Sequence, residues 1–376
     1  MKNRTIKYNL EKREHRVTFC YDTEAPDISN DMARLFSDKK MLLVIDKSIN
    51  KKVIKNIFKD LEHSDFDVKF LMVDGHKSNK TEKLLFKIID KCIENKFTKK
   101  SLILSCSGGV VGDVCALASS LYLRGLIYFH IPTTMTAIVD SCIGGKTGIN
   151  YKKIINSLGS YYHPRNVFIS KNIINCIPKR EFSSGFAEII KSGCLENNNI
   201  LNFLKKNRSK LLKRDFKIIS KIISLTLKTK INFFKNDIYE NSKRLNLNFG
   251  HTYAHAIEMA LKSNNKDIIR HGEAVGIGML CEIFYSEGKS AKFNLIRDLL
   301  KKYNLPTDIK KYIGNKNKKT IANEIYKNIF LDKKRVNNFP RCIKINKLGN
   351  PSVIEMKSNS RIFRTIENII FCETIR

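Results

Sequence analysis

Histidines in the stretch 248–278 have the residue type and spacing of metal ligands. His251 and His255 are four residues apart, so on a helix they share one face. His271 follows a polar, turn-like segment. Because neutral imidazole is a common metal ligand, the pattern predicts a divalent-metal site with ligands from two helices. The alternative is that His255 and His271 are polar residues near a core, since H-x-x-x-H alone is a weak signal.

A second stretch has the composition of a phosphate-binding loop. A strand-like apolar run, 101–105, leads into the glycine-rich segment Cys106–Asp113, and a helix-like segment follows from Val114 to about Leu123. Glycines between a strand and a helix let the backbone approach a phosphate, which then faces the N–H groups of the helix N-terminus. The segment lacks the full G-x-G-x-x-G pattern, so a tight turn without a ligand is an equal alternative.

The two segments that follow are rich in hydroxyls. Residues 131–134 contain adjacent threonines, and residues 139–150 combine a glycine pair with Lys146. This composition favours recognition of anions and hydroxyl groups. The spacing differs from G-x-x-x-x-G-K, so a P-loop is excluded.

Short apolar runs alternate with helix-like segments in the N-terminal half, which predicts βαβ units and a mainly parallel sheet. The strand-like runs are 41–46, 67–73, 101–105, 126–131 and 167–169, with helix-like segments at 50–61 and 81–94. The order differs from the usual Rossmann arrangement, because the glycine loop follows the third strand of this series rather than the first.

Helical periodicity dominates after Cys176, with no convincing strand before Cys342. The helical segments are 181–193, 203–234, 253–262, 273–288 and 294–302, of which 203–234 reads as one long basic amphipathic helix. We therefore predict a Rossmann-like α/β domain over residues 1–176 and a mostly α-helical domain over residues 177–376.

Composition excludes several classes of protein. At 376 residues and 42% hydrophobic residues the chain can hold two full cores, but its apolar runs are too short to span a membrane. The basic N-terminus lacks the apolar region of a signal peptide, and the ten cysteines show no C-x-x-C, which predicts reduced thiols and a cytoplasmic protein. The net charge of +33 is spread along a chain rich in Lys, Asn and Ile, as an AT-biased coding background produces. We therefore expect no nucleic-acid or membrane partner.

Six motifs together resemble those of the 3-dehydroquinate synthases, which belong to the sugar phosphate cyclases. The motifs are GGVVGD (108–113), PTT (132–134), DSCIGGKTGIN (140–150), EFSSGFAEIIKSG (181–193), RLNLNFGHTYAHAIE (244–258) and HGEAVGIGM (271–279). They occur in the family's order and spacing, and the resemblance spans roughly residues 40–340. It implies a dehydroquinate synthase-like fold.

The resemblance also implies an activity. Members of this family convert the sugar phosphate 3-deoxy-D-arabino-heptulosonate 7-phosphate to 3-dehydroquinate and phosphate in the shikimate pathway, on the route to the aromatic amino acids. They use NAD and one divalent metal ion, zinc or cobalt. NAD oxidises a substrate hydroxyl transiently, phosphate is eliminated, the hydride returns, and an intramolecular aldol reaction closes the ring. The resemblance further suggests a homodimer.

Residue roles follow from the same resemblance. Residues that match the metal ligands are Glu188, His251 and His271. Residues that match cofactor contacts are Asp74, Gly75, Gly109, Val110, Val111, Gly112, Asp113, Thr133, Thr134, Asp140 and Lys146. Residues that match the catalytic and substrate-binding cluster are Lys146, Asn156, Lys191, Lys230, Arg244, Asn248, His255, Lys333 and Lys334. In this assignment Glu188 replaces His255 as the third ligand.

Three motifs depart from the family pattern, all on the cofactor side. Ser107 stands where the first loop usually has glycine. His76 and Asn79, with Lys80 adjacent, replace a carboxylate and a lysine that hold the adenosine ribose, and Ile155 replaces a cofactor-side lysine. These changes predict weaker NAD binding than is usual for the family, measurable by calorimetry.

Two other kinds of function remain open on the sequence. One is another sugar phosphate cyclase or a metal-dependent polyol dehydrogenase, which would differ in substrate or would accumulate NADH. The other is a basic binding protein, or a pseudoenzyme retained for another role. Against the second stands the complete set of chemically suited residues, namely Glu188, Lys191, Lys230, Arg244, His251 and His271.

Overall fold

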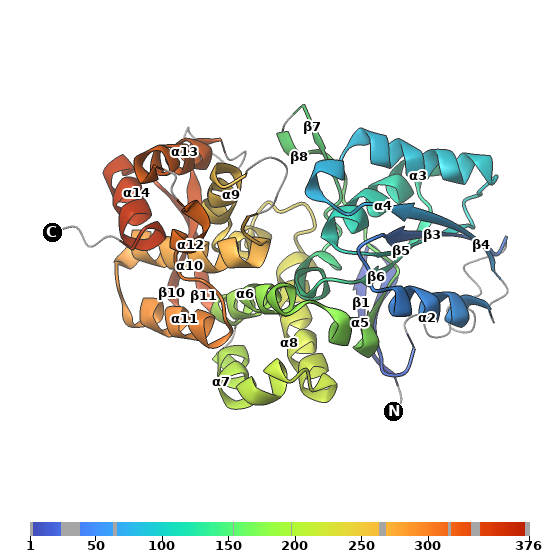
Figure 1. Ribbon diagram of the computed structural model, residues 1–376, viewed down its shortest axis with the longest axis horizontal. Helices are drawn as coiled ribbons and strands as arrows, with labels where there is room; N and C mark the ends of the chain where they lie inside the picture. Colours follow the sequence, from blue (N-terminus) through green and yellow to red (C-terminus); the bar gives the residue numbers. More distant parts are fainter. Residues whose placement is uncertain are drawn as a thin grey trace. The chain divides into compact units, whose positions relative to one another are not determined.

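The chain divides into two compact units. The computed structural model describes residues 3–23, 38–62, 66–152, 154–196, 198–262, 268–314, 317–331 and 339–372. The first unit is Met1–Pro178, blue to green in Figure 1, and the second is Lys179–Arg376, green to red. The composition of the sequence places the boundary between residues 176 and 177.

A seven-stranded sheet forms the centre of the first unit, in the order β1-β2-β9-β6-β5-β3-β4. From β2 onward every neighbouring pair is parallel, which confirms the predicted mainly parallel sheet. The strands that carry this parallel part are β3 (Lys40–Asp46), β4 (Asp67–Val73), β5 (Leu102–Ser107), β6 (Ile127–Pro132) and β9 (Asn166–Ser170). The main helices are α2 (Lys51–Glu62), α3 (Glu82–Glu94) and α4 (Gly109–Leu121), with α5 (Lys171–Cys176) at the end of the unit.

The apolar runs form strands because both faces of the sheet are covered. Along β3, Leu42 and Val44 pack with α3 and α4, whereas Leu43 and Ile45 pack with α2. A strand buried on both sides needs continuous apolar residues rather than alternation, and the sequence of β3 supplies them.

The edge hairpin of this sheet was not predicted. Strands β1 (Arg4–Leu10) and β2 (Arg13–Cys20) pair antiparallel, and β2 pairs parallel with β9. Their sequences are strongly basic, and alternate positions are buried, with Cys20 at the end of β2 buried as well. The turn uses Glu11 and Lys12 at positive φ of 47° and 63° instead of the Asn-Gly pair that usually marks a hairpin.

Two further features differ from the prediction. Helix α4 begins at Gly109 rather than at residue 114, so the glycine-rich segment is itself the first turn of the helix. A small antiparallel hairpin, β7 (Ile149–Tyr151) and β8 (Ile154–Leu158), was not predicted from the sequence. The described part of the unit also contains the short helices η2 (Lys77–Asn79), η3 (Tyr122–Arg124) and η4 (Ala137–Ser141).

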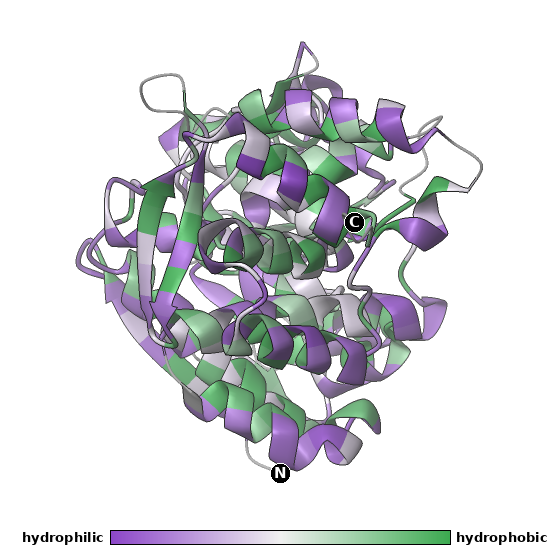
Figure 2. Cartoon of the chain, turned by 90° about the vertical axis from the view of Figure 1, so that its left-hand side faces the viewer, coloured by the Kyte–Doolittle hydropathy of each residue, from purple (hydrophilic) through white to green (hydrophobic). Residues whose placement is uncertain are grey.

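Helices dominate the second unit, as predicted. They are α6 (Lys179–Leu195), α7 (Asn198–Leu212), α8 (Phe216–Phe234), η5 (Lys243–Asn248), α9 (His251–Ala260), α10 (His271–Glu287), α11 (Ala291–Lys302), α12 (Lys310–Ile313), α13 (Lys318–Phe330), α14 (Asn359–Thr365) and η6 (Ile366–Ile370). A two-stranded sheet, β10 (Arg341–Lys347) and β11 (Asn350–Glu355), packs with them. Helix α10 is buried along most of its length and packs against α6 and α9. Figure 2 shows hydrophobic and hydrophilic residues interleaved along the helices of this unit.

The single helix predicted over 203–234 is wrong, because two helices, α7 and α8, cover this stretch. Arg214 adopts a left-handed φ of 60°, which ends the first helix. Asp215 then caps the second, since its side chain accepts a hydrogen bond from the Ile218 N–H at 3.2 Å. The lysine-rich sequence on both sides obscured this capping signal.

Two general expectations can be compared with the structure. The ten cysteines are free thiols, and all except Cys176 and Cys372 are buried. Among the described residues, no helix is long and apolar enough to cross a membrane.

Candidate metal and cofactor sites

One carboxylate and two imidazoles converge in the second unit. Glu188 lies in the middle of α6, His251 opens α9, and His271 opens α10. One ligand atom from each lies within 4.8 Å of the other two. The Nε2 atoms of His251 and His271 are 3.7 and 3.6 Å from Glu188 Oε1. Ligands bound at about 2.1 Å to one tetrahedral ion are separated by about 3.4 Å, so these spacings fit a single small cation.

The histidine rings are oriented as metal ligands usually are. The Nδ1 atom of His251 is 3.2 Å from the carbonyl oxygen of Phe249. The Nδ1 atom of His271 is 3.1 Å from Glu258 Oε2. A hydrogen on Nδ1 satisfies each acceptor and leaves the Nε2 lone pair directed toward Glu188. Glu258 was not identified from the sequence, although its position at the end of the H-x-x-x-H-x-x-E run is a signal that could have found it.

The burial of Glu188 also fits a cation. Its side chain is 1% exposed, and Lys191 Nζ lies 2.5 Å from Oε2. Across the described ranges, neither carboxylate oxygen has a hydrogen bond of ordinary geometry. A buried carboxylate is costly unless cations or donors surround it, so a divalent ion beside the two imidazoles would complete its coordination.

Close packing of α6 against α10 sets the distance between Glu188 and His271. The Gly272 N–H donates to Ser184 Oγ at 3.1 Å. A Cβ on Gly272 would overlap the carbonyl oxygen of Ser184, so only glycine permits this approach. One turn of α6 separates Ser184 from Glu188.

An ion pair braces the same helix junction. Arg180 donates two hydrogen bonds to Glu273, at 2.8 and 2.7 Å. Burial alone would raise the pKa of the Glu273 carboxyl, but the hydrogen bonds and charge of Arg180 and the Arg270 N–H outweigh it and hold the pKa below its ordinary value. A second pair joins Arg270 to Glu181 at 2.5 Å.

His255 is a neighbour of this cluster and not a member of it. Its ring centroid is 5.5 Å from that of His251 and 6.2 Å from that of His271. The structure therefore groups His251 with Glu188 and His271, whereas helical spacing alone suggested a pair with His255. A ligand from a distant helix leaves no mark in local periodicity, so only the motif resemblance pointed to Glu188.

Buried cations and amides lie on neighbouring elements of the second unit. Lys191 on α6 and Lys230 on α8 are buried, and Arg244 on η5 is 1% exposed. Arg244 Nη1 donates to the Ile238 carbonyl at 2.5 Å. Asn248 Nδ2 donates to Glu240 Oε1 at 2.8 Å. Several positive charges gathered on neighbouring elements suit a substrate with carboxylate and phosphate groups.

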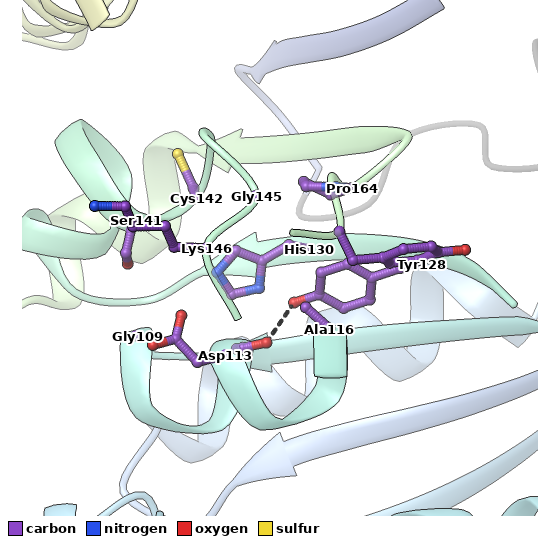
Figure 3. A pocket seen from close by; sticks show the side chains of 12 residues that line it. Gly109, Asp113, Ala116, Tyr128, His130, Ser141, Cys142, Gly145, Lys146 and Pro164 are labelled. Atoms are coloured by element: carbon purple, nitrogen blue, oxygen red, sulfur yellow. Dashed lines mark hydrogen bonds between the residues drawn. The ribbon is translucent and has the colours of Figure 1, made fainter. Parts of the chain in front are cut away.

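A small cavity in the first unit gathers several of the predicted cofactor residues (Figure 3). Gly109, Gly112 and Asp113 of α4 and Lys146 all line it. Thr133 follows β6, and its N–H donates to the Ser107 carbonyl at 2.9 Å, which joins the two βα turns. Among the remaining predicted residues, Thr134 Oγ1 accepts the Ala137 N–H at 3.2 Å, Asp140 is in η4, and Val110 and Val111 are in the first turns of α4.

His130 packs against the glycine-rich turn. Its Nδ1 is 2.6 Å from Ser105 Oγ, and Tyr128 Oη donates to the Gly112 carbonyl at 3.1 Å, the dashed line in Figure 3. A Cβ on Gly112 would lie 3.0 Å from the His130 ring. Burial lowers the pKa of His130 to about 4, so the imidazole is neutral at physiological pH.

Lys80, rather than Asn79, supplies the cation near the glycine-rich turn. Its Nζ is 2.5 Å from Asp113 Oδ2 and 2.6 Å from Asn156 Oδ1. Asn79 instead donates to the carbonyl of Asp74 at 3.2 Å. Lys80 was named only as a neighbour in the sequence analysis, because it comes one position later than the family pattern.

Asp46 is another residue that the sequence analysis missed. It ends β3 and is buried, and a Cβ on Gly75 would overlap its carboxylate. Its position at the carboxyl end of a parallel strand, where ligands of such sheets bind, is a signal that could have found it. The predicted substrate contacts Lys333 and Lys334 lie outside the described residues.

The fold defines a class of enzymes. A 2-epi-5-epi-valiolone synthase from Streptomyces hygroscopicus subsp. jinggangensis, solved with NAD+ and Zn2+ bound, has a TM-score of 0.80 at 20% identity, with 96% of this chain and 97% of that chain covered. A 2-deoxy-scyllo-inosose synthase, complexed with carbaglucose-6-phosphate, NAD+ and Co2+, has a TM-score of 0.81 at 21% identity, with 98% and 100% covered. A glycerol dehydrogenase from Schizosaccharomyces pombe has a TM-score of 0.64 at 15% identity, with 93% and 87% covered. The fold is that of the dehydroquinate synthase-like enzymes.

Sequence comparison gives the family within this class. The family models described as 3-dehydroquinate synthase N-terminal and C-terminal match residues 70–184 and 185–335. A 3-dehydroquinate synthase of Prochlorococcus marinus is 35% identical over 322 residues, which cover 83% of this chain and 87% of that protein. One of Ruminiclostridium cellulolyticum is 29% identical over 365 residues, covering 96% and 98%. The chain belongs to the 3-dehydroquinate synthase family and is an enzyme of the carbon–oxygen lyase class, which confirms the resemblance seen in the sequence.

Proposed function

We propose that this enzyme converts 3-deoxy-D-arabino-heptulosonate 7-phosphate to 3-dehydroquinate and inorganic phosphate. The observation that carries the proposal is the buried group of Glu188, His251 and His271, with the cation of Lys191 beside it, in a chain of this family. Such a site combines a place for a divalent metal with charge for an anionic substrate.

Glu188, His251 and His271 would hold the metal ion, and zinc and cobalt both suit these ligands. When bound, the ion supplies Lewis acidity toward the hydroxyls of the substrate. The chain's own contribution is orientation. Phe249 and Glu258 fix the two rings, and Lys191 forms an ion pair with Glu188 in its buried position.

The first unit would hold NAD, which would supply reversible hydride transfer without net formation of NADH. Its diphosphate would lie at the N-terminus of α4, where the backbone N–H groups of Gly109 and its neighbours have no helical acceptor. The other proposed contacts are Asp74, Gly75, Val110, Val111, Gly112, Asp113, Thr133, Thr134, Asp140 and Lys146. Lys80 joins this set through its ion pair with Asp113.

The buried cations would bind the anionic groups of the substrate. Arg244 presents a planar fork that matches a carboxylate or phosphate, while Lys191 and Lys230 act as point charges. Asn248 and Asn156 would bind hydroxyl groups, and His255 would exchange a proton with a substrate oxygen close to the metal ligands. Lys333 and Lys334 remain proposed phosphate contacts.

Phosphate release from the heptulosonate phosphate tests the proposal directly. We expect release that requires a catalytic amount of NAD, stops after chelation, and returns when zinc or cobalt is added. Absorbance at 340 nm should show no net NADH. The fold is also similar to that of a glycerol dehydrogenase, so a polyol dehydrogenase is the alternative. Such an enzyme would instead accumulate NADH with its substrate. Absence of phosphate release at saturating NAD and metal would contradict the proposal.

Assembly and location are part of the same proposal. By resemblance to its family the enzyme would be a cytoplasmic homodimer that acts on a small sugar phosphate. Sedimentation equilibrium of the purified protein tests the first point, since a dimer of 43.4 kDa chains differs twofold in mass from a monomer.

A further inference from the structure

A buried hydroxyl at the glycine-rich turn has no hydrogen-bond partner among the residues that the structure describes. Ser107 is 0% exposed, and within the described part of the chain its Oγ neither donates nor accepts a hydrogen bond. Its main chain is paired normally, because the Ser107 carbonyl accepts the Thr133 N–H at 2.9 Å. The unpaired group is therefore the side chain alone.

Alternation along β5 places this side chain on the α4 side of the sheet. Ile103 packs with residues of α3 and α4, whereas Leu104 and Cys106 pack in the cluster that includes α2. Ser105 lies on the same side as Ile103, with its Oγ 2.6 Å from His130 Nδ1 and 2.8 Å from Tyr128 Oη. Ser107 follows two residues later and shares that face.

Ser107 also immediately precedes the start of α4. Gly108 is the N-cap and provides no side-chain hydrogen bond, and the helix runs for 13 residues from Gly109. The first N–H groups of a helix have no acceptor within it. The Ser107 hydroxyl, which has no partner among the described residues, therefore lies next to N–H groups that have no acceptor within α4.

A buried hydroxyl without a partner destabilises a protein unless a ligand supplies the missing acceptor. The complementary ligand at a set of donors beside a helix N-terminus is an anion with several oxygen acceptors. The proposed cofactor carries such a group, its diphosphate.

We propose that Ser107 donates a hydrogen bond to the diphosphate of the bound dinucleotide. This inference rests on the proposed function, because it assumes that the first unit binds NAD. It makes Ser107, which replaces a glycine of the family pattern, an additional cofactor contact. It also opposes the loss of affinity expected from the changes at His76 and Ile155.

Calorimetry on the full-length protein tests this contact. We expect Ser107→Ala to bind NAD+ about tenfold more weakly than wild type, because a hydrogen bond to a charged acceptor is lost. The loss should be the same for ADP-ribose, which has the diphosphate but lacks nicotinamide. Ser107→Gly should show a similar loss, which covers the case in which the alanine variant folds poorly.

Thermal unfolding without nucleotide gives a second measurement, in which the variant should gain stability although it loses affinity for NAD+. Ser107→Ala should melt about 2 °C higher than wild type, since an unpaired buried hydroxyl has been removed. Ser119→Ala is the matched control, because Ser119 is a buried serine of α4 whose Oγ already donates to the Cys115 carbonyl at 2.8 Å. That variant should not gain stability and should bind NAD+ like wild type.

The outcomes separate this inference from the proposed function. If wild type binds NAD+ and ADP-ribose and Ser107→Ala binds both equally well, the contact is overturned while the cofactor proposal stands. If the variant loses affinity for NAD+ but not for ADP-ribose, the hydroxyl contacts the nicotinamide half and the diphosphate assignment is wrong. If wild type binds neither ligand, the cofactor part of the proposed function fails, and the Ser107 contact fails with it.

Discussion

At the scale of single residues, Glu188 shows how charge is arranged for a metal ion. Its carboxylate is 1% exposed and is approached by one lysine and two imidazoles. The pair with Lys191 offsets part of the cost of burying the carboxylate, but neutral imidazoles add no positive charge. The site is therefore expected to gain most from a cation that all three ligand atoms contact.

Replacing Glu188 by glutamine tests this arrangement, because the amide keeps the shape and removes the charge. We expect zinc affinity to fall by at least about 100-fold, more than is typical for loss of an outer-shell partner. Competition with a chromophoric chelator measures the affinity without substrate or NAD. Glu287→Gln, which removes a carboxylate paired with Lys292 at 2.9 Å elsewhere on α10, should leave affinity unchanged. Equal affinity in wild type and Glu188→Gln would remove Glu188 from the ligand set.

Glu258 is expected to act through His271 rather than on the ion. Its Oε2 lies 3.1 Å from His271 Nδ1 and fixes the ring orientation. Glu258→Ala should weaken zinc or cobalt binding by about 10- to 100-fold, whereas Glu258→Gln, which keeps an acceptor oxygen, should weaken it less. The visible absorption spectrum of the cobalt form reports the ligand geometry and should change in the alanine variant. An unchanged spectrum and affinity would contradict the positioning role.

His130 makes the stability of the first unit depend on pH. Its pKa is about 4 in the folded protein because it is buried, and about 6.5 when unfolded. Below pH 6.5 the unfolded chain takes up a proton that the folded protein excludes, so stability falls between pH 6.5 and 4. Wild type should lose free energy of unfolding between pH 7 and pH 5, and His130→Asn should reduce this loss by about 2 kcal/mol. Urea unfolding at both pH values measures it, and identical pH dependence in the two proteins would be inconsistent with a buried neutral imidazole.

At the scale of elements, the sequence correctly predicted the helices and strands whose apolar residues coincide with their buried positions. The apolar run of β3 and the long, mostly apolar segment of α10 identified their elements because burial on both faces, or along most of a helix, demands such residues. The β1–β2 hairpin was missed because basic residues occupy its exposed positions and its turn lacks glycine. The break between α7 and α8 was missed because one capping aspartate marks it.

Contact between α6 and α10 depends on one glycine that periodicity could not identify. Gly272→Ala would force the helices apart at Ser184, which we expect to destabilise the second unit by about 3 kcal/mol and to weaken zinc binding as His271 moves from Glu188. Urea unfolding and chelator competition measure the two effects. Gly288→Ala is the comparison, because its surroundings are open and only its positive φ of 76° opposes a side chain. That variant should lose about 1 kcal/mol and keep its zinc affinity.

At the scale of the whole molecule, only the site residues that lie within the family-like motifs could be predicted from the sequence. Glu188, His251 and His271 are far apart in sequence and were grouped by resemblance, and the structure brings them together. Glu258 and Lys80 were missed because each acts through a contact with another element, Glu258 with His271 at 3.1 Å and Lys80 with Asp113 at 2.5 Å. Local sequence patterns predict the helices and strands. The contacts that position site residues form only when segments distant in the sequence pack together.

The net charge of +33 is a property of the whole chain and leads to a last prediction. Basic residues occur on exposed positions throughout both units, as the strands β1 and β2 and the helices α2 and α7 illustrate. A field of this kind attracts any polyanion at low salt, but without a defined row of phosphate contacts the attraction is nonspecific. We expect DNA to be shifted at about 20 mM salt, equally for unrelated sequences, and released near 150 mM salt. Phosphate release from the sugar phosphate should be unaffected by DNA at 150 mM salt. Sequence-selective binding that persists at that salt concentration would show instead that the charge serves a nucleic-acid partner.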